Sequence, residues 1–305
     1  MQRWFVVLTL PFLLFGLTAA HKKSDREEEA LLGPVRSASS QYIRLTPGEP
    51  DKKGRPQQQD LISYDTHGNE AGRTIYDDYG FLVGRQVNKH DPNGHLIESL
   101  LSDPGGAVMT RQVYAYSDGK LSETIHYGPK GEVGLREVNR YDGNGRLSEG
   151  VYYEEEKEAA KTVYRYDGAG RRAEAVFYMA DGSKAVAPVG PCLGAHRMTY
   201  SYDENGRPHE AVAYEPDGTM KKRWLYAYNE KGLMSVEKLE DDYDYTTRLH
   251  AYEYDSRGNW IKRISTVSEK PKPRQLEFER SAGIKAKGET RDAGRMIISR
   301  KIDYY

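Results

Sequence analysis

The sequence predicts an all-β protein, a meander of consecutive antiparallel β-hairpins that forms one long, curled and partly closed sheet. Three observations support this prediction. A turn motif whose clearest copies read Tyr-Asp-x-x-Gly recurs eight times, about 26 residues apart, and a fixed period indicates one small unit stacked on itself. A second glycine turn falls halfway through most units, which is the spacing of hairpins. The array also shows no helical periodicity.

Composition narrows the classes of function. The 305 residues include 45 basic and 46 acidic side chains, well interspersed, for a net charge of -1. This balance provides no basic stripe for nucleic acid and no basic surface for an anionic membrane. Tyrosine dominates the aromatic residues, 24 against 6 phenylalanines, and tyrosine suits half-buried sheet surfaces because its hydroxyl can still find a partner.

Residues 1–20 have the pattern of a secretory signal peptide. Arg3 is followed by the apolar run Trp4 to Leu17, and the small residues Thr18-Ala19-Ala20 precede His21. The run is shorter than the ~20 residues that a membrane-spanning helix needs. We therefore expect a secreted or periplasmic protein with no stable membrane insertion after signal cleavage.

Residues 21–59 form a charged N-terminal segment. Ser24 or Asp25 can cap a short helix that carries acidic residues in its first turn. Gly33-Pro34 would end it, and a first strand is expected from Val35 to Leu45. The polar residues 46–59, rich in Pro, Gly, Lys and Gln, indicate a loop.

Residues 60–268 hold the repeat array, with some 16–18 strands expected over the whole chain. Asp at the first turn position and Gly at the fourth fit a type I turn that ends with glycine in the left-handed region. A sheet of more than ~10 twisted strands curls. The first-turn glycines are Gly68, Gly94, Gly119, Gly145, Gly170, Gly206, Gly232 and Gly258.

The turn geometry predicts which side chains share a face. The Asp should lie opposite the residue after the Gly, which pairs Asp142 with Arg146 on the outer face. The preceding Tyr should point to the other, concave face. Equivalent Asp–Arg pairs are Asp167 with Arg171 and Asp203 with Arg207.

A column of glutamates is predicted on this concave tyrosine face, four residues after the turn glycine in five consecutive units. A carboxylate on a packed face needs partners or an altered pKa. Two interpretations stay open: a site for cationic or sugar ligands, or a structural ladder satisfied by Tyr, Arg and water. The column consists of Glu98, Glu123, Glu149, Glu174 and Glu210.

The array is interrupted and then ends. Residues 183–197 are an insertion that contains Cys192, the single cysteine, so no intramolecular disulfide can form. Near residues 154–158 a run of glutamates replaces the glycine turn. Residues 269–305 are expected to be a linker followed by a closing C-terminal strand.

The motif, most complete as Tyr141-Asp142-x-x-Gly145-Arg146, resembles the YD repeat of the Rhs and teneurin families over roughly residues 60–265. The resemblance implies a spiralling β-sheet, which closes into a hollow shell in large members. With about eight units, this chain resembles a small, stand-alone, exported protein of bacterial type. The encapsulating function of the large members does not carry over to it.

The sequence contains no phosphate loop, nucleophile elbow or Cys-x-x-Cys pair, and no metal-ligand spacing or catalytic set stands out. We expect no cofactor. The favoured function is a non-enzymatic extracytoplasmic scaffold or binding module for a protein or glycan partner. The alternative is a carbohydrate-active enzyme that uses carboxylates of the glutamate column on the concave face.

Overall fold

The computed structural model describes residues 24–45, 57–77, 79–188, 190, 192–281 and 288–305. The signal peptide expected at residues 1–20 and most of the loop expected at residues 46–59 lie outside these residues. Within them the prediction of an all-β antiparallel meander of hairpins is confirmed, since sequence-adjacent strands pair along the whole chain.

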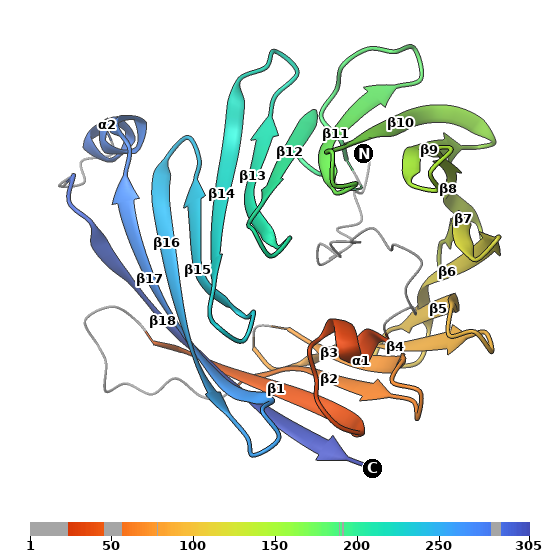
Figure 1. Cartoon of the computed structure of the whole chain (residues 1–305), viewed down its shortest axis with the longest axis horizontal. Coiled ribbons are helices and arrows are strands. Elements are labelled where there is room, and N and C mark those ends of the chain that lie inside the picture. The colour runs from red at the N-terminus through yellow and green to blue at the C-terminus, as the bar shows by residue number, and fades with distance from the viewer. Residues whose placement is uncertain (1–23, 46–56, 78, 189, 191, 282–287) are drawn as a thin grey trace.

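The strands form one closed antiparallel barrel of 18 strands (Figure 1). They are β1 (Val35–Leu45), β2 (Gln57–Tyr64), β3 (Glu70–Tyr76), β4 (Leu82–His90), β5 (Leu96–Ser102), β6 (Val108–Ser117), β7 (Lys120–Tyr127), β8 (Val133–Tyr141), β9 (Leu147–Glu154), β10 (Lys157–Tyr166), β11 (Arg172–Met179), β12 (Arg197–Tyr202), β13 (Pro208–Tyr214), β14 (Met220–Tyr228), β15 (Met234–Glu240), β16 (Asp244–Tyr254), β17 (Trp260–Pro271) and β18 (Arg291–Tyr304).

The expectation of a partly closed sheet is wrong, and the reason lies at the two ends of the chain. The first strand, β1, pairs with β18 from Val35 opposite Tyr304 to Leu45 opposite Arg295. It pairs on its other side with β2. Pairing of the first and last strands removes the two free edges that an open sheet of the described strands would have.

Two short helices accompany the barrel. α1 (Asp25–Glu28) begins at the N-cap Ser24, whose hydroxyl accepts a hydrogen bond from the backbone N–H of Glu27 in a capping box, as the sequence predicts. α2 (Pro273–Ser281) lies between β17 and β18, where a linker was expected. Neither helix in the described part of the chain has the length and apolar character needed to cross a bilayer.

The Tyr-Asp-x-x-Gly turns lie together at one end of the barrel, which we call the first rim. In the turn at Gly145 (φ +76°), Oδ1 of Asp142 accepts hydrogen bonds from the backbone N–H groups of Asn144 and Arg146, each at 2.9 Å. The predicted turn chemistry is thereby confirmed. The glutamate run between β9 and β10 forms a tight turn in which Glu155 and Glu156 both have positive φ, as in a two-residue hairpin loop.

A β-bulge just after each first-rim turn decides which face the return strand presents. Tyr141 pairs with Leu147, whereas Arg140 pairs with Glu149, so Ser148 is an extra residue. Because side chains alternate along a strand, one extra residue moves everything beyond it to the other face. The prediction that the glutamate column shares a face with the tyrosines is therefore wrong.

The tyrosine face is the inner wall of the barrel. α1 lies inside the ring of strands in Figure 1, and the Asp25 carboxylate is 3.8 Å from Nε2 of His90, which occupies the motif-tyrosine position of β4. We call the tyrosine face the inner wall and the glutamate face the outer wall. The largest hydrophobic cluster lies on the inner wall of β9 to β13, where Tyr152, Tyr164 and Phe177 pack against Cys192 of the insertion.

Candidate functional site

The five predicted glutamates lie on the outer wall, and each forms an ion pair with a neighbouring strand. Glu98 is typical: its carboxylate contacts Nζ of Lys89 and Nε of Arg111, both at 2.5 Å. These hydrogen bonds lower the pKa of Glu98. The other pairs are Glu123 with Arg136, Glu149 with Arg140 and Lys161, Glu174 with Arg165 and Arg197, and Glu210 with Arg223.

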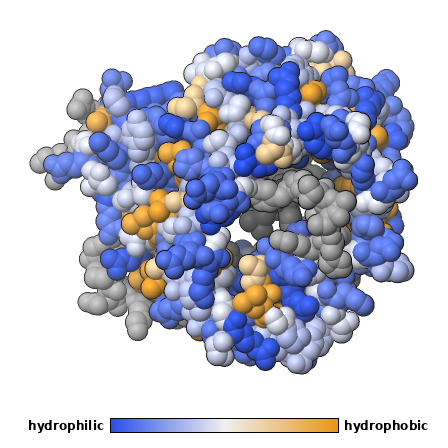
Figure 2. All heavy atoms as spheres, viewed as in Figure 1, coloured by the Kyte–Doolittle hydropathy of each residue, from blue (hydrophilic) through white to orange (hydrophobic). Residues whose placement is uncertain are grey.

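These pairs belong to cross-strand rows that cover the outer wall. One row runs from β4 to β9 through Lys89, Glu98, Val113, Ile125, Arg136 and Tyr153. The Arg136 guanidinium also stacks over the Tyr153 ring, 5.1 Å from its centre. The face of the molecule seen in Figure 2 is mostly hydrophilic, with hydrophobic residues in small, separate patches. The arrangement matches the structural-ladder interpretation of the column.

The alternative of a carbohydrate-active enzyme required these carboxylates on the concave face, and that placement is wrong because the bulge turns them outward. Ion pairing with Arg and Lys satisfies their charge without a ligand. That Glu98, Glu123, Glu149, Glu174 and Glu210 bind a ligand stays a prediction.

The motif arginines link one repeat to the next along the first rim. Arg146 is held by Asp142, with Nε 2.8 Å from Oδ2, and its guanidinium lies 4.8 Å from the ring centre of Tyr166 in the following unit. The Tyr166 hydroxyl donates to the carbonyl of Leu147 at 2.7 Å. The predicted Asp–Arg pairs therefore form, but the expectation that they face outward, away from the tyrosines, is wrong. Arg171 with Tyr202 and Arg207 with Tyr228 repeat the stacking at 4.7 Å.

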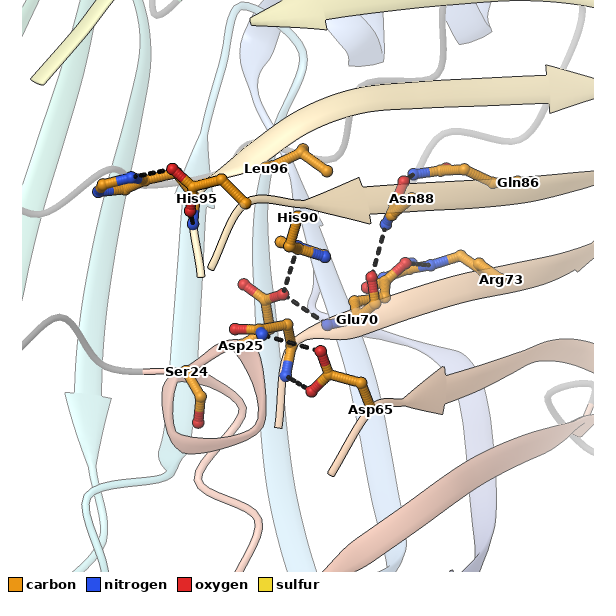
Figure 3. A network of polar contacts seen from close by, with 12 residues as sticks. Ser24, Asp25, Asp65, Glu70, Arg73, Gln86, Asn88, His90, His95 and Leu96 are labelled. Carbon is orange, nitrogen blue, oxygen red and sulfur yellow. Dashed lines mark hydrogen bonds and ion pairs between the residues drawn. The ribbon is translucent and has the colours of Figure 1, made fainter. Parts of the chain in front are cut away.

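The N-terminal segment binds the inside of the first rim (Figure 3). The Asp25 carboxylate accepts a hydrogen bond from the backbone N–H of Glu70 at 2.6 Å. The Glu70 side chain in turn holds Arg73, with Oε2 2.9 Å from Nη2. Asn88 of β4 donates to the Glu70 carbonyl at 3.0 Å. These contacts attach α1 to β3 and β4.

A buried asparagine attaches the same segment next to the closing strand. Asn259 stands in the last unit where the complete motif has Arg, and it is 1% exposed. Its Oδ1 accepts from the Leu32 N–H at 2.6 Å, and its Nδ2 donates to the Leu32 carbonyl at 2.9 Å and to the Tyr304 hydroxyl at 2.8 Å. One side chain therefore joins the N-terminal segment, the last repeat and the end of β18.

The inner wall contains a different kind of glutamate. Glu137 of β8 lies opposite Thr124 of β7 and Tyr152 of β9. Burial raises its pKa, and no basic side chain of the described residues pairs with it. The neighbouring Tyr152 and Tyr164 also have raised pKa values because of burial, with Glu137 contributing to both. An unpaired carboxyl group among tyrosines is the strongest candidate for a binding site.

Gly150 of β9 lets neighbouring side chains close in over its backbone. A Cβ atom placed on Gly150 would lie 3.0 Å from Oε1 of Glu137, 3.6 Å from Oδ1 of Asn139 and 3.7 Å from the Tyr164 hydroxyl. Oδ1 of Asn139 is buried without a hydrogen-bond partner. The side chains of these three residues, from β8 and β10, thus crowd the space over one glycine, and we call them the Gly150 cluster.

Other titratable groups line the wall around the Gly150 cluster. His126 of β7, whose pKa burial lowers, lies one row from Glu137 and contacts the Gln112 amide at 3.1 Å. Cys192 of the insertion has a pKa raised by burial to about 12. Arg172 of β11 stacks on Tyr164 at 4.5 Å from the ring centre, with its buried Nε unpartnered. None of these groups neutralises Glu137 by an ion pair.

Sequence reasoning missed the Gly150 cluster, although a signal was present. Five residues after the turn glycine, units two to six have Ser99, Thr124, Gly150, Ala175 and Ala211, so one unit lacks a side chain at a position that the bulge turns inward. The described residues contain no group of three or more His, Cys, Asp or Glu placed to hold a metal ion.

Comparison with known proteins gives a remote likeness of fold. No protein-family model matches the chain, and no curated protein matches it. A porin-like protein from Bacteroides uniformis is 11% identical, with 88% of this chain and 98% of that chain covered and a TM-score of 0.42. A porin-like protein from Bacteroides vulgatus is 11% identical over 87% and 97% of the two chains, with a TM-score of 0.33.

A third similar structure is the Tc holotoxin pore of Photorhabdus luminescens, 10% identical, with 72% of this chain and 15% of that chain covered and a TM-score of 0.31. These likenesses are too remote to transfer a function to this chain. The expected membership of the YD-repeat family is wrong: no family model matches the chain, and its hairpins close into one barrel of 18 strands.

Proposed function

We propose that this chain is a non-enzymatic, extracytoplasmic binding barrel that keeps its outer wall in water and holds a glycan or protein partner on its inner wall. The observation that carries the proposal is the set of ion-paired rows on the outer wall. A strand face in contact with lipid carries an apolar band ≈ 25 Å tall, and an Arg or Lys at the bilayer midplane costs about 2–4 kcal/mol.

The apolar residues of the outer wall are covered over β9, β11 and β13, whereas Val87 and Leu249 of the same wall are 53% and 52% exposed. Val151, Val176 and Val212 are 0%, 4% and 7% exposed, although they belong to the outer face. These buried valines leave little apolar surface for acyl chains over β9 to β13, which favours water at that part of the wall.

The inner wall supports a binding role through its mixture of rings and polar groups. Binding sites commonly combine aromatic walls with a few well-placed polar atoms. Tyr114, whose hydroxyl donates to Gln112 at 2.5 Å, and the tyrosines around Glu137 provide that mixture. A glycan, with apolar ring faces and many hydroxyls, suits it better than a purely apolar ligand.

Vesicle flotation tests the outer-wall proposal. The exported protein is purified without detergent, mixed with phospholipid vesicles and centrifuged through a density gradient. We expect it to stay monodisperse in the aqueous fraction. Stable flotation with the vesicles that survives high salt would show strands in lipid and would overturn the proposal.

A glycan array and a pull-down from exported proteins test the binding proposal. Replacement of Glu149 and Glu174 by Gln should leave partner binding largely intact, because these side chains are outside and already ion-paired. Turnover of a glycan that these two substitutions abolish would favour the enzyme instead. Loss of partner binding in the same variants would support the glutamate column as the ligand site.

A further inference from the structure

An open depression lies on the outer wall over β2, β3 and β4, where the glutamate column is interrupted. Gly72 of the first unit stands at the position that Glu98 and its equivalents occupy in the next five units. The depression has a volume of about 240 Å³, and we call it the Gly72 depression. Two cross-strand rows line it, Leu61–Thr74–Arg85 and Ser63–Gly72–Val87.

The Gly72 depression combines exposed apolar side chains with a positive charge that lacks an acidic partner. Leu61 and Val87 are 37% and 53% exposed. Nη1 of Arg85 lies 3.4 Å from the carbonyl oxygen of Pro104, and no carboxylate of the described residues pairs with this arginine. The glutamate that pairs with outer-wall arginines in other units is replaced here by Gly72. A complementary partner therefore carries an apolar group beside a negative charge.

The turn between β3 and β4 presents that combination. Tyr79 and Phe81 are 78% and 71% exposed, the highest fractions among the large hydrophobic side chains that the structure describes. Asp77 holds the turn, since its Oδ1 accepts from the N–H of Tyr79 at 2.8 Å and from that of Phe81 at 2.9 Å. Among the described side chains, none that is basic pairs with Asp77. An aromatic group and a carboxylate are thus held side by side before a partner binds, which lowers the entropic cost of binding.

We propose that two copies of this chain associate through the β3–β4 hairpin, with Phe81 of each copy in the Gly72 depression of the other and Asp77 beside Arg85. The turn and the depression belong to the same hairpin, so a two-fold contact forms both interactions twice. A cavity of about 150 Å³ holds a benzene ring, and the depression is larger than that. This inference goes beyond the proposed function, which concerns the inner wall.

The dimensions of the hairpin permit this reciprocal contact. Val87 follows Phe81 by about 20 Å along β4. Two copies of β4 that lie antiparallel and face to face bring Phe81 of one copy opposite Val87 of the other, and the reverse. Asp77 lies at the level of Phe81, because its N–H donates to the Phe81 carbonyl at 2.9 Å. Arg85 shares the outer face with Val87, two residues away, so its long side chain can reach the Asp77 carboxylate of the second copy.

Sedimentation equilibrium over a wide range of protein concentrations tests the inference. The unaltered protein should show a monomer–dimer equilibrium. Phe81→Ala and Val87→Asp should each weaken dimerisation by at least about tenfold, because each removes an apolar group from the centre of the contact. Val133 is as exposed as Val87 and lies on the outer wall of β8, so Val133→Asp is the matched control and should change nothing. A protein that stays monomeric, or equal losses in Val87→Asp and Val133→Asp, would overturn the inference.

A double-mutant cycle tests the charged contact. Asp77→Asn keeps an oxygen that can cap the turn, and Arg85→Gln removes the positive charge. Each should weaken dimerisation by about threefold, and the double variant should lose no more than either single variant because both remove the same contact. Additive losses would show that the two side chains do not meet and would overturn this arrangement. Unaltered thermal unfolding of each variant shows that the fold is retained. Vesicle flotation and ligand binding are measured separately, so failure of the dimer leaves the proposed function standing.

Discussion

Glu149 on the outer wall and Glu137 on the inner wall belong to neighbouring strands, β9 and β8, but their surroundings differ. Glu149 lies 2.9 Å from Nη1 of Arg140 and 3.7 Å from Nζ of Lys161. Glu137 has Thr124 and Tyr152 across the strands, and burial raises its pKa. The difference shows that a glutamate's role in this repeat depends on which wall it faces.

The two walls also differ in how they exclude water. On the outer wall, long Arg and Lys side chains cover single rows of valine, so stability comes from many small contacts. On the inner wall, Phe177 and Tyr152 pack beneath the insertion in one contiguous cluster. Loss of one large inner side chain should therefore cost more than loss of one outer valine.

Truncation in the inner cluster should produce the largest effect. Phe177, 1% exposed, packs against residues of the insertion, so Phe177→Ala should lower the free energy of unfolding by about 3–5 kcal/mol. The matched outer substitution Val151→Ala should cost about 1.6 kcal/mol, two methylene equivalents. Urea denaturation measures both. Equal losses would mean that the insertion does not form a core on the inner wall.

The two kinds of glutamate should respond to pH with opposite signs. A raised folded-state pKa gives stability that is present below the unfolded pKa and is lost as pH rises through the folded pKa. Glu137→Gln should therefore stabilise the protein at pH 7, by about 1 kcal/mol, and change little below about pH 4. His126, Tyr152, Tyr164 and Cys192 face the same region and stay unchanged in the variant.

The pKa of Glu98 is lowered in the folded protein. Its contribution to stability is therefore present above the unfolded-state pKa and is lost as the pH falls through the folded-state pKa. Glu98→Gln should destabilise the protein at pH 7 by less than about 1 kcal/mol, the usual value of an exposed pair. Thermal unfolding from pH 3 to pH 8 checks both variants. If both substitutions changed the stability at pH 7 in the same direction, the distinction between the two walls would not hold.

The rim stacking should give the smallest effect. Arg207 lies 4.7 Å from the ring centre of Tyr228 and is held by Asp203. A double-mutant cycle with Arg207→Ala and Tyr228→Leu should give a coupling energy of about 0.5–1 kcal/mol. Arg165, an exposed outer-wall arginine away from Tyr228, serves as the control and should show no coupling to it.

The sequence by itself determined the hairpin array and its turns. Asp and Gly at fixed spacing define the first-rim turns because glycine accepts the positive φ observed at Gly145 and its equivalents. The cap at Ser24 was predictable because cap chemistry is local. The strand Val35–Leu45 and a closing strand in the last residues were predictable as well.

Tertiary structure decided the rest. The bulge at Ser148 and its equivalents moves the glutamate column to the outer wall, a change that one inserted residue causes and that side-chain periodicity alone does not reveal. Closure depends on pairing between β1 and β18, which are separated in the sequence by all the other strands of the barrel. Glu137, Asn139 and Tyr164 gather around Gly150 only because the register of β8, β9 and β10 places them there.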